Sequence, residues 1–228
     1  MNTAIIVAAG SGSRFKSTTP KQFVEIHGKP LLVHTLERFE VAQSINSVIL
    51  VLAEDRIEYF ESLVQRFQLS KLFAVVSGGA TRAESVRNGL DAVAFEEGIV
   101  AVHDGARPLV SPDEIDETIE KARVTGAACL VASVTDTIKT ISGKEIANTL
   151  DREKLRRALT PQAFRVELLR KAFEESELSD AVTDECYLVE KLGHPIAFVE
   201  GNPRNIKVTH SDDLLLAEVF LRNAKFAH

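Results

Sequence analysis

The sequence has little cysteine and no long apolar run, and both absences narrow the class of protein. Its two cysteines, Cys129 and Cys186, lack a paired CxxC spacing, so we expect buried thiols in place of a disulfide scaffold or a thiolate zinc site. No stretch approaches the roughly 20 apolar residues that a membrane-spanning helix needs. The first ten residues carry no charged segment with a cleavage site. We therefore expect a cytoplasmic protein with no membrane partner.

Basic residues are also in the minority, because 27 Lys and Arg stand against 33 Asp and Glu for a formal net charge of −6. This balance argues against nucleic acid as a partner, since a phosphate backbone normally requires a broad basic surface. Residues 1–24 are the exception: they contain Arg14, Lys16 and Lys21 but no Asp or Glu. We expect a positively charged pocket at this end of an acidic protein.

The 228 residues, 45% of them hydrophobic and without repeats or low-complexity segments, suit one α/β domain with a small appendage. Short apolar runs at 4–8, 48–52, 73–76, 99–102 and 129–134 predict strands. Segments 31–39, 56–67, 83–94 and 115–125 carry apolar residues at spacings of three and four and predict helices, the last introduced by Ser111, Pro112 and Glu114. This alternation predicts a doubly wound, mostly parallel, Rossmann-like sheet in a single domain over residues 1–228.

The alternation of strands and helices stops after residue 134. Segments 137–141 and 146–150 predict two short strands around Ser142-Gly143-Lys144, and hence a protruding β-arm subdomain at about 135–157. An isolated hairpin is marginally stable in water, so such an arm usually packs on something. The residues leave open whether it does so or lies solvated on the surface.

Small, hydroxylic and charged residues follow four of the predicted strands, at 9–14, 77–82, 103–108 and 135–137. Ligands of open parallel sheets bind outside the carboxyl ends of the strands, so we expect a binding site at this edge. Gly10 and Gly12 would let the backbone approach a phosphate closely. The loop matches neither the dinucleotide fingerprint nor the P-loop, since Phe15-Lys16-Ser17 stands where their defining residues belong. Arg14 and Lys21 could neutralise the charge of a triphosphate attacked at its α-phosphorus, or they could be solvated loop cations.

Six strings of residues, in order along nearly the whole chain, carry a family resemblance. They are AAGSGSRFKSTTPKQF (8–23), GGATRAESVRNGL (78–90), HDGARPLV (103–110), TLDREKLRRALTPQAF (149–164), VTDE (182–185) and NIKVT (205–209). Together they resemble the 2-C-methyl-D-erythritol 4-phosphate cytidylyltransferases of non-mevalonate isoprenoid biosynthesis. Two positions depart from the family pattern. Gly105 replaces a common Ala, which should widen the pocket slightly, and Arg204 replaces an often acidic residue.

The resemblance implies transfer of CMP from CTP to 2-C-methyl-D-erythritol 4-phosphate, with 4-diphosphocytidyl-2-C-methyl-D-erythritol and pyrophosphate as products. It implies that Arg14 and Lys21 stabilise the transition state and that Arg152 and Lys207 hold the polyol phosphate. It places CTP near Ala8, Ala9, Gly10, Gly12, Gly79 and Ser85, and the polyol near Asp104, Arg107 and Thr183.

Two other functions stay in view. An alditol-phosphate cytidylyltransferase, acting for example on ribitol 5-phosphate, shares the glycine-rich start and the HD-x-x-RP and NIKVT strings, but TLDR and ALTPQ favour the first interpretation. A nucleotide-binding regulatory module or a dinucleotide oxidoreductase would be favoured only if the loop from Gly10 to Gly12 stood alone.

A divalent metal, Mg²⁺, is expected because joining two phosphates brings like charges together. Asp104 is the candidate ligand, directly or through water, although it could equally be a strand-end Asp that bonds to its own loop. The six histidines show no paired spacing such as HExxH, so we expect no zinc site. The resemblance further implies a homodimer in which the arms interlock and Arg152 approaches the partner's site.

Overall fold

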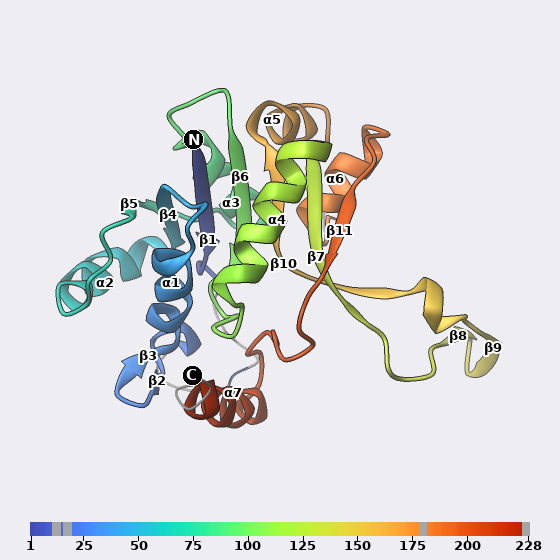
Figure 1. Ribbon diagram of the computed structural model, residues 1–228. Helices are drawn as coiled ribbons and strands as arrows, with labels where there is room; N and C mark the ends of the chain where they lie inside the picture. The colour runs from blue at the N-terminus through green and yellow to red at the C-terminus, as the bar shows by residue number, and fades with distance from the viewer. Residues whose placement is uncertain (11–14, 16–19, 178–181, 225–228) are drawn as a thin grey trace.

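A seven-stranded sheet forms the centre of the protein, whose computed structural model describes residues 1–10, 15, 20–177 and 182–224. The strand order is β11-β7-β10-β6-β1-β4-β5 (Figure 1). Every pairing in this sheet is parallel except those of β10 with its two neighbours. The strands are β1 (Asn2–Val7), β4 (Ser47–Leu52), β5 (Leu72–Ser77), β6 (Ile99–Asp104), β7 (Ala127–Ser133), β10 (Arg156–Arg165) and β11 (Ala197–Glu200).

Helices cover both faces of the sheet because successive strand residues point to opposite sides. On β1, Ala4 and Ile6 pack with α1 (Leu31–Val41), α2 (Ile57–Val64) and α4 (Pro112–Thr125), whereas Ile5 packs on the other face. That face is covered by α3 (Arg82–Asp91), α5 (Val166–Glu174) and α6 (Glu185–Lys191). The predicted doubly wound, mostly parallel fold is confirmed.

The structure also confirms the predicted start of α4. Ser111 accepts a hydrogen bond from the backbone of Glu114, and the Glu114 side chain bonds back to Ser111, with Pro112 in the first turn. This reciprocal capping satisfies two helix donors that would otherwise lack partners.

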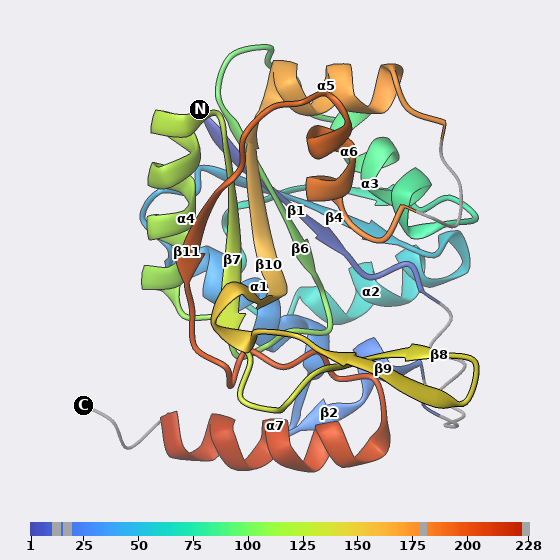
Figure 2. The same cartoon turned by 90° about the vertical axis from the view of Figure 1, so that its right-hand side faces the viewer.

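The last helix lies apart from the two main faces. α7 (Ser211–Ala224) runs beneath the sheet, where Ala217 and Leu221 pack with Ile26, Leu31 and Val208 (Figure 2). Ile26 belongs to a small hairpin of β2 (Glu25–Ile26) and β3 (Lys29–Pro30). In the part of the chain that the structure describes, no helix is long and apolar enough to cross a membrane.

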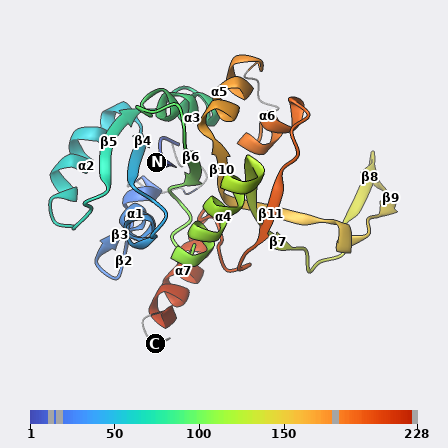
Figure 3. The same cartoon turned by 45° about the horizontal axis from the view of Figure 1, so that its top comes forward.

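The predicted arm is a separate two-stranded sheet of β8 (Lys139–Ser142) and β9 (Glu145–Thr149). It projects from the body next to β7 and β10 (Figure 3). A short 3-10 helix, η4 (Arg152–Lys154), follows it. Arg156 and Arg157 already pair with β7 as the start of β10, so the boundary expected near 157 lies inside a strand of the main sheet.

Candidate active site

A cleft of about 300 Å³ opens where β1, β5 and β6 end. It lies at the carboxyl edge of the parallel strands, as expected for an open α/β sheet. Seven of the residues singled out in the sequence line it: Ala8, Gly10, Lys21, Gly79, Ser85, Asp104 and Lys207.

One side of the cleft is formed by the loop between β5 and α3, which packs closely on the end of β1. A Cβ atom on Gly78 would lie 2.3 Å from the Ala9 Cβ and 2.9 Å from the Ser85 Oγ, so only glycine permits this approach. The backbone N–H of Gly79 donates to the Ser85 hydroxyl at 3.1 Å, and this hydroxyl donates to the Thr81 carbonyl at 2.9 Å. The loop that carries Gly79 and Ser85 is therefore fixed against Ala9, which itself is not among the residues that line the cleft.

Gly105 does not widen the cleft, contrary to the expectation from the sequence. A Cβ at this position would lie 2.9 Å from the Ala8 Cβ and 3.0 Å from the Leu32 Cδ1. Its lack of a side chain lets the end of β1 pack against α1, because the space that an alanine methyl would need is already filled.

Asp104 is the centre of the charged network in the cleft. Its Oδ1 accepts from the Arg82 Nε at 3.2 Å, while its Oδ2 accepts from the Arg107 Nε at 3.2 Å and lies 3.0 Å from the Lys207 Nζ. Burial alone would raise the pKa of Asp104, but the nearby Arg82, Lys207 and Arg107 outweigh it and hold the pKa well below its usual range. The carboxylate therefore stays charged and fixes three cations around itself.

The network extends inward to Glu185, a fully buried residue at the start of α6. Arg82 bonds to it with both terminal nitrogens, NH1 to Oε1 at 2.6 Å and NH2 to Oε2 at 3.1 Å. A guanidinium group thus joins two carboxylates, a geometry that suits its planar array of donors.

The Thr160 hydroxyl links the buried His103 ring to the backbone of Asp104. The His103 Nε2 lies 3.1 Å from the Arg107 carbonyl, which only accepts, so Nε2 carries the proton. The Thr160 hydroxyl then donates to Nδ1 at 3.0 Å and accepts from the Asp104 N–H at 3.2 Å. Complete burial lowers the pKa of His103 to about 4, so the ring is neutral at pH 7.

The chain is similar to known proteins of one family over nearly its whole length. A family model described as 2-C-methyl-D-erythritol 4-phosphate cytidylyltransferase matches residues 2–223. The chain belongs to this family. A relative from Halalkalibacterium halodurans with the same description is 42% identical over 220 residues, which cover 96% of each protein.

Longer relatives and solved structures extend the comparison. A bifunctional IspD/IspF enzyme from Desulfotalea psychrophila is 44% identical over 98% of this chain, which spans only 58% of that enzyme. The crystal structure of the 4-diphosphocytidyl-2C-methyl-D-erythritol synthase from Anaerococcus prevotii superposes with a TM-score of 0.85 at 30% identity, covering 97% of this chain and 96% of that one. The family member from Thermus thermophilus gives 0.75 at 34% identity, covering 97% and 100%.

Several residues that the family resemblance assigned to the site are not among the described residues that line the cleft. Arg107 bridges two other residues: its NH1 donates to the Asn205 carbonyl at 2.9 Å, and its Nε donates to the Asp104 carboxylate. Thr183 is exposed just ahead of α6. Arg152 is exposed in η4, where its NH1 donates to the Thr135 carbonyl at 2.7 Å. Gly12 and Arg14 lie outside the described residues.

Sequence reasoning missed Arg82 and Glu185. Arg82 is the last residue of a polar segment that we expected at the cleft, and VTDE contains Glu185, so both stood within strings already singled out. What the sequence did not indicate is that these two residues, 103 positions apart, form an ion pair. Cys129 and Cys186 are buried free thiols, as predicted.

Direct ligation of a metal by Asp104 does not fit this geometry. Both of its oxygens already accept hydrogen bonds from cationic side chains, and a divalent ion would be repelled by those same cations. Among the described residues, no three His, Cys, Asp or Glu side chains are arranged to hold a metal ion.

Proposed function

We propose that this chain transfers the cytidylyl group of CTP to 2-C-methyl-D-erythritol 4-phosphate. An oxygen of the polyol phosphate forms a bond to the α-phosphorus of CTP, and the bond from that phosphorus to the bridging oxygen of pyrophosphate breaks. The products are 4-diphosphocytidyl-2-C-methyl-D-erythritol and pyrophosphate. The observation that carries the proposal is the cleft in which Lys21 and Lys207 line the same space as Gly10 and Gly79, in a chain of this family.

The cleft suits a reaction that depends on position and charge. The acceptor phosphate already carries an anionic oxygen at pH 7, so no protein nucleophile is needed. Lys21 donates to the Val208 carbonyl at 2.9 Å, which ties its ammonium group to the segment that carries Lys207. Fixed cations of this kind stabilise the charge that gathers on the phosphorus during attack. We assign the same task to Arg14.

The two ends of the cleft favour different parts of the substrates. Ala8, Ala9, Gly10 and Gly79 offer backbone groups and little side chain, which suits the nucleotide, with Gly12 as a further phosphate contact. A pocket just wide enough for a pyrimidine would exclude purines by size, and hydrogen bonds matched to cytosine would exclude uracil. We assign the polyol end to Asp104 and Lys207, with Arg107 bonded to Asp104 and Thr183 outside the described lining.

We propose that the magnesium ion enters with CTP, as part of the substrate complex, because the carboxylate of Asp104 is already bonded to cations. We also propose a homodimer in the cytoplasm in which the arm carries Arg152 to the partner's cleft. Two observations support the dimer: Arg152 is absent from the described lining of its own cleft, and Ile141 and Ile146 on the arm are 74% and 68% exposed.

A pyrophosphate-release assay tests the function. The protein is mixed with CTP and Mg²⁺ and, in parallel, with 2-C-methyl-D-erythritol 4-phosphate or ribitol 5-phosphate. We expect release with the methylerythritol compound and little with the other. Faster release with ribitol 5-phosphate would assign the protein to the alditol phosphates. Binding of CTP without any release would make it a nucleotide-binding module.

A further inference from the structure

Neutralising the charge of Asp104 does not explain why Arg82 is also bonded to Glu185. Asp104 alone already faces three cations, yet the chain buries a second carboxylate, with none of its surface exposed, to bind Arg82. Burial raises the pKa of Glu185, and the charge of Arg82 offsets this only in part. A buried ion pair is weak evidence for stability, because apolar residues of similar volume often serve as well.

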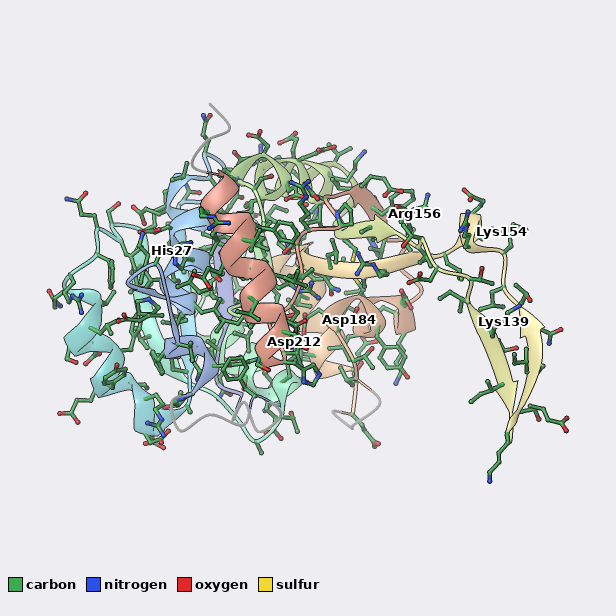
Figure 4. All side chains as sticks on the ribbon, turned by 90° about the horizontal axis from the view of Figure 1, so that it is seen from below. His27, Lys139, Lys154, Arg156, Asp184 and Asp212 are labelled. Atoms are coloured by element: carbon green, nitrogen blue, oxygen red, sulfur yellow. The ribbon has the colours of Figure 1, made fainter. Side chains whose placement is uncertain are left out.

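The structure fixes Glu185 in place from both sides. Gln162, a buried residue of β10, donates from its Nε2 to the Asp184 carboxylate at 2.9 Å and accepts at its Oε1 from the Cys186 N–H at 3.0 Å. The residues before and after Glu185 are therefore tied to the central sheet by the same amide group. The N-terminus of α6 cannot move relative to β10 without breaking both bonds. Asp184, labelled in Figure 4, lies on the body of the protein.

This arrangement leaves Arg82 a single orientation. With NH1 and NH2 bonded to Glu185, its Nε points at the Asp104 Oδ1. The other oxygen of Asp104 is then left for Arg107 and Lys207. Without the charge of Glu185, Arg82 could turn its terminal nitrogens to Asp104 or to a bound phosphate, where it would compete with Lys207.

We propose that Glu185 is a positioning residue, which holds Arg82 on one oxygen of Asp104 so that Lys207 is directed at the acceptor phosphate from the other. The inference rests on the proposed function. It assigns Glu185 no contact with either substrate. Its effect therefore falls on the polyol phosphate and leaves the nucleotide unaffected.

The test compares Glu185→Gln with Glu190→Gln, an exposed glutamate on the same helix. We expect Glu185→Gln to lower kcat/KM for 2-C-methyl-D-erythritol 4-phosphate roughly tenfold, mainly through KM, while Kd for CTP measured by calorimetry changes less than about twofold. Glu190→Gln should match the wild type. A Glu185→Gln protein that unfolds at lower temperature but keeps its kcat/KM would show a structural role only and overturn the proposal.

A second background tests whether Glu185 acts through Arg82. In an Arg82→Met protein, adding Glu185→Gln should change kcat/KM by less than about twofold, because the group to be positioned is gone. An equal loss in both backgrounds would overturn the proposal. If Glu185→Gln does not fold, Glu185→Asp replaces it. That variant keeps the charge but withdraws it by one methylene, so a raised polyol KM supports the proposal and an unchanged KM contradicts it.

The same assay separates the two claims. Wild-type protein that releases no pyrophosphate with either polyol phosphate would contradict the proposed function, and this inference with it. Active wild-type protein with an unaffected Glu185→Gln variant would contradict this inference alone.

Discussion

The cleft and the arm use the same kinds of charged residue in opposite surroundings. In the cleft, Asp104 is buried and bonded to three cations, and two of these, Arg82 and Arg107, are also held by Glu185 and by the Asn205 carbonyl. On the arm, Asp151 and Lys154 form a pair whose side chains are 56% and 83% exposed. Exposed pairs are screened by water and contribute little, so they do not fix a geometry. The cleft is therefore organised by its own contacts, whereas the exposed pair on the arm does not fix the position of the arm.

Apolar residues show the same contrast. Ile5 and Ile49 in the sheet are almost completely buried, while Ile141 and Ile146 on the arm are mostly exposed. Figure 4 shows Lys139 and Lys154 on the arm, far from Asp184 and Asp212 on the body. An isolated two-stranded hairpin is marginally stable in water, so a surface that covered these two side chains would stabilise the arm.

The largest expected effect comes from removing a cation of the organised region. Replacing Lys21 by Ala should lower kcat by about 10²-fold or more, as expected when a preorganised donor to a developing charge is lost. Lys121→Ala, an exposed lysine of α4, is the control. Steady-state kinetics at saturating CTP and polyol phosphate measure the effect. Near-wild-type kcat in the Lys21→Ala protein would remove this residue from the mechanism.

A second prediction concerns the contribution of His103 to the pH dependence of the protein's stability. His103 has a pKa of about 4 in the folded protein, below the value of about 6.5 for an unperturbed histidine. Between these values the unfolded chain binds the extra proton, so acidification favours unfolding. From pH 7 to pH 5 this histidine should remove about 2 kcal/mol of stability.

Urea unfolding of His103→Gln at both pH values measures that contribution. The fall in the free energy of unfolding should be smaller than in the wild type by about 2 kcal/mol. The exposed His210, changed to Gln, should leave the wild-type fall intact. Buried carboxylates such as Glu185 are present in all three proteins and cancel in the comparison. Parallel curves for His103→Gln and the wild type would mean that His103 accepts its proton without unfolding.

The same contrast explains what the sequence could predict. The strands of the main sheet and the α-helices up to residue 134 followed from periodicity, which is a local property of the chain, whereas the hairpin of β2 and β3 was not predicted. The insertion of β10 between β6 and β7 depends on pairing between segments far apart, and its polar Thr160 and Gln162 hide its central place in the sheet. α5 was missed although Val166, Leu169 and Phe173 have helical spacing and are buried.

For the site, too, the sequence predicted the location but not the tertiary contacts. The rule that ligands bind at strand ends located the cleft, because it follows from topology. The partner of Arg82 did not follow, because an aspartate or glutamate at the start of a helix is usually solvated, and burial of Glu185 is set by tertiary packing alone. The closed contact of Gly105 with Ala8 was missed for the same reason.

A third prediction concerns whether Arg152 near the arm of one chain completes the cleft of a second chain. Lys21→Ala and Arg152→Ala chains are unfolded, mixed equally and refolded. Half of the dimers should be mixed, and if Arg152 serves the partner's cleft, one site in each carries both changes and the other neither. Random pairing in a two-fold dimer then restores about a quarter of wild-type activity. If each Arg152 serves its own cleft, every site keeps a change and activity stays low even when mass spectrometry confirms mixed dimers.

The smallest expected effect is the loss of one methylene at matched positions of the two regions. Ile49→Val in the buried β4 should lower the free energy of unfolding by about 1 kcal/mol at any protein concentration. Ile146→Val on the exposed β9 should change it by less than about 0.5 kcal/mol in dilute protein, where few partners are present. In concentrated protein the cost of Ile146→Val should grow, because a covered isoleucine loses contacts that an exposed one never made. Denaturant unfolding at several protein concentrations measures both variants. A cost for Ile146→Val that is the same at every concentration would mean that no second copy covers the arm, and the arm would then be a solvated hairpin.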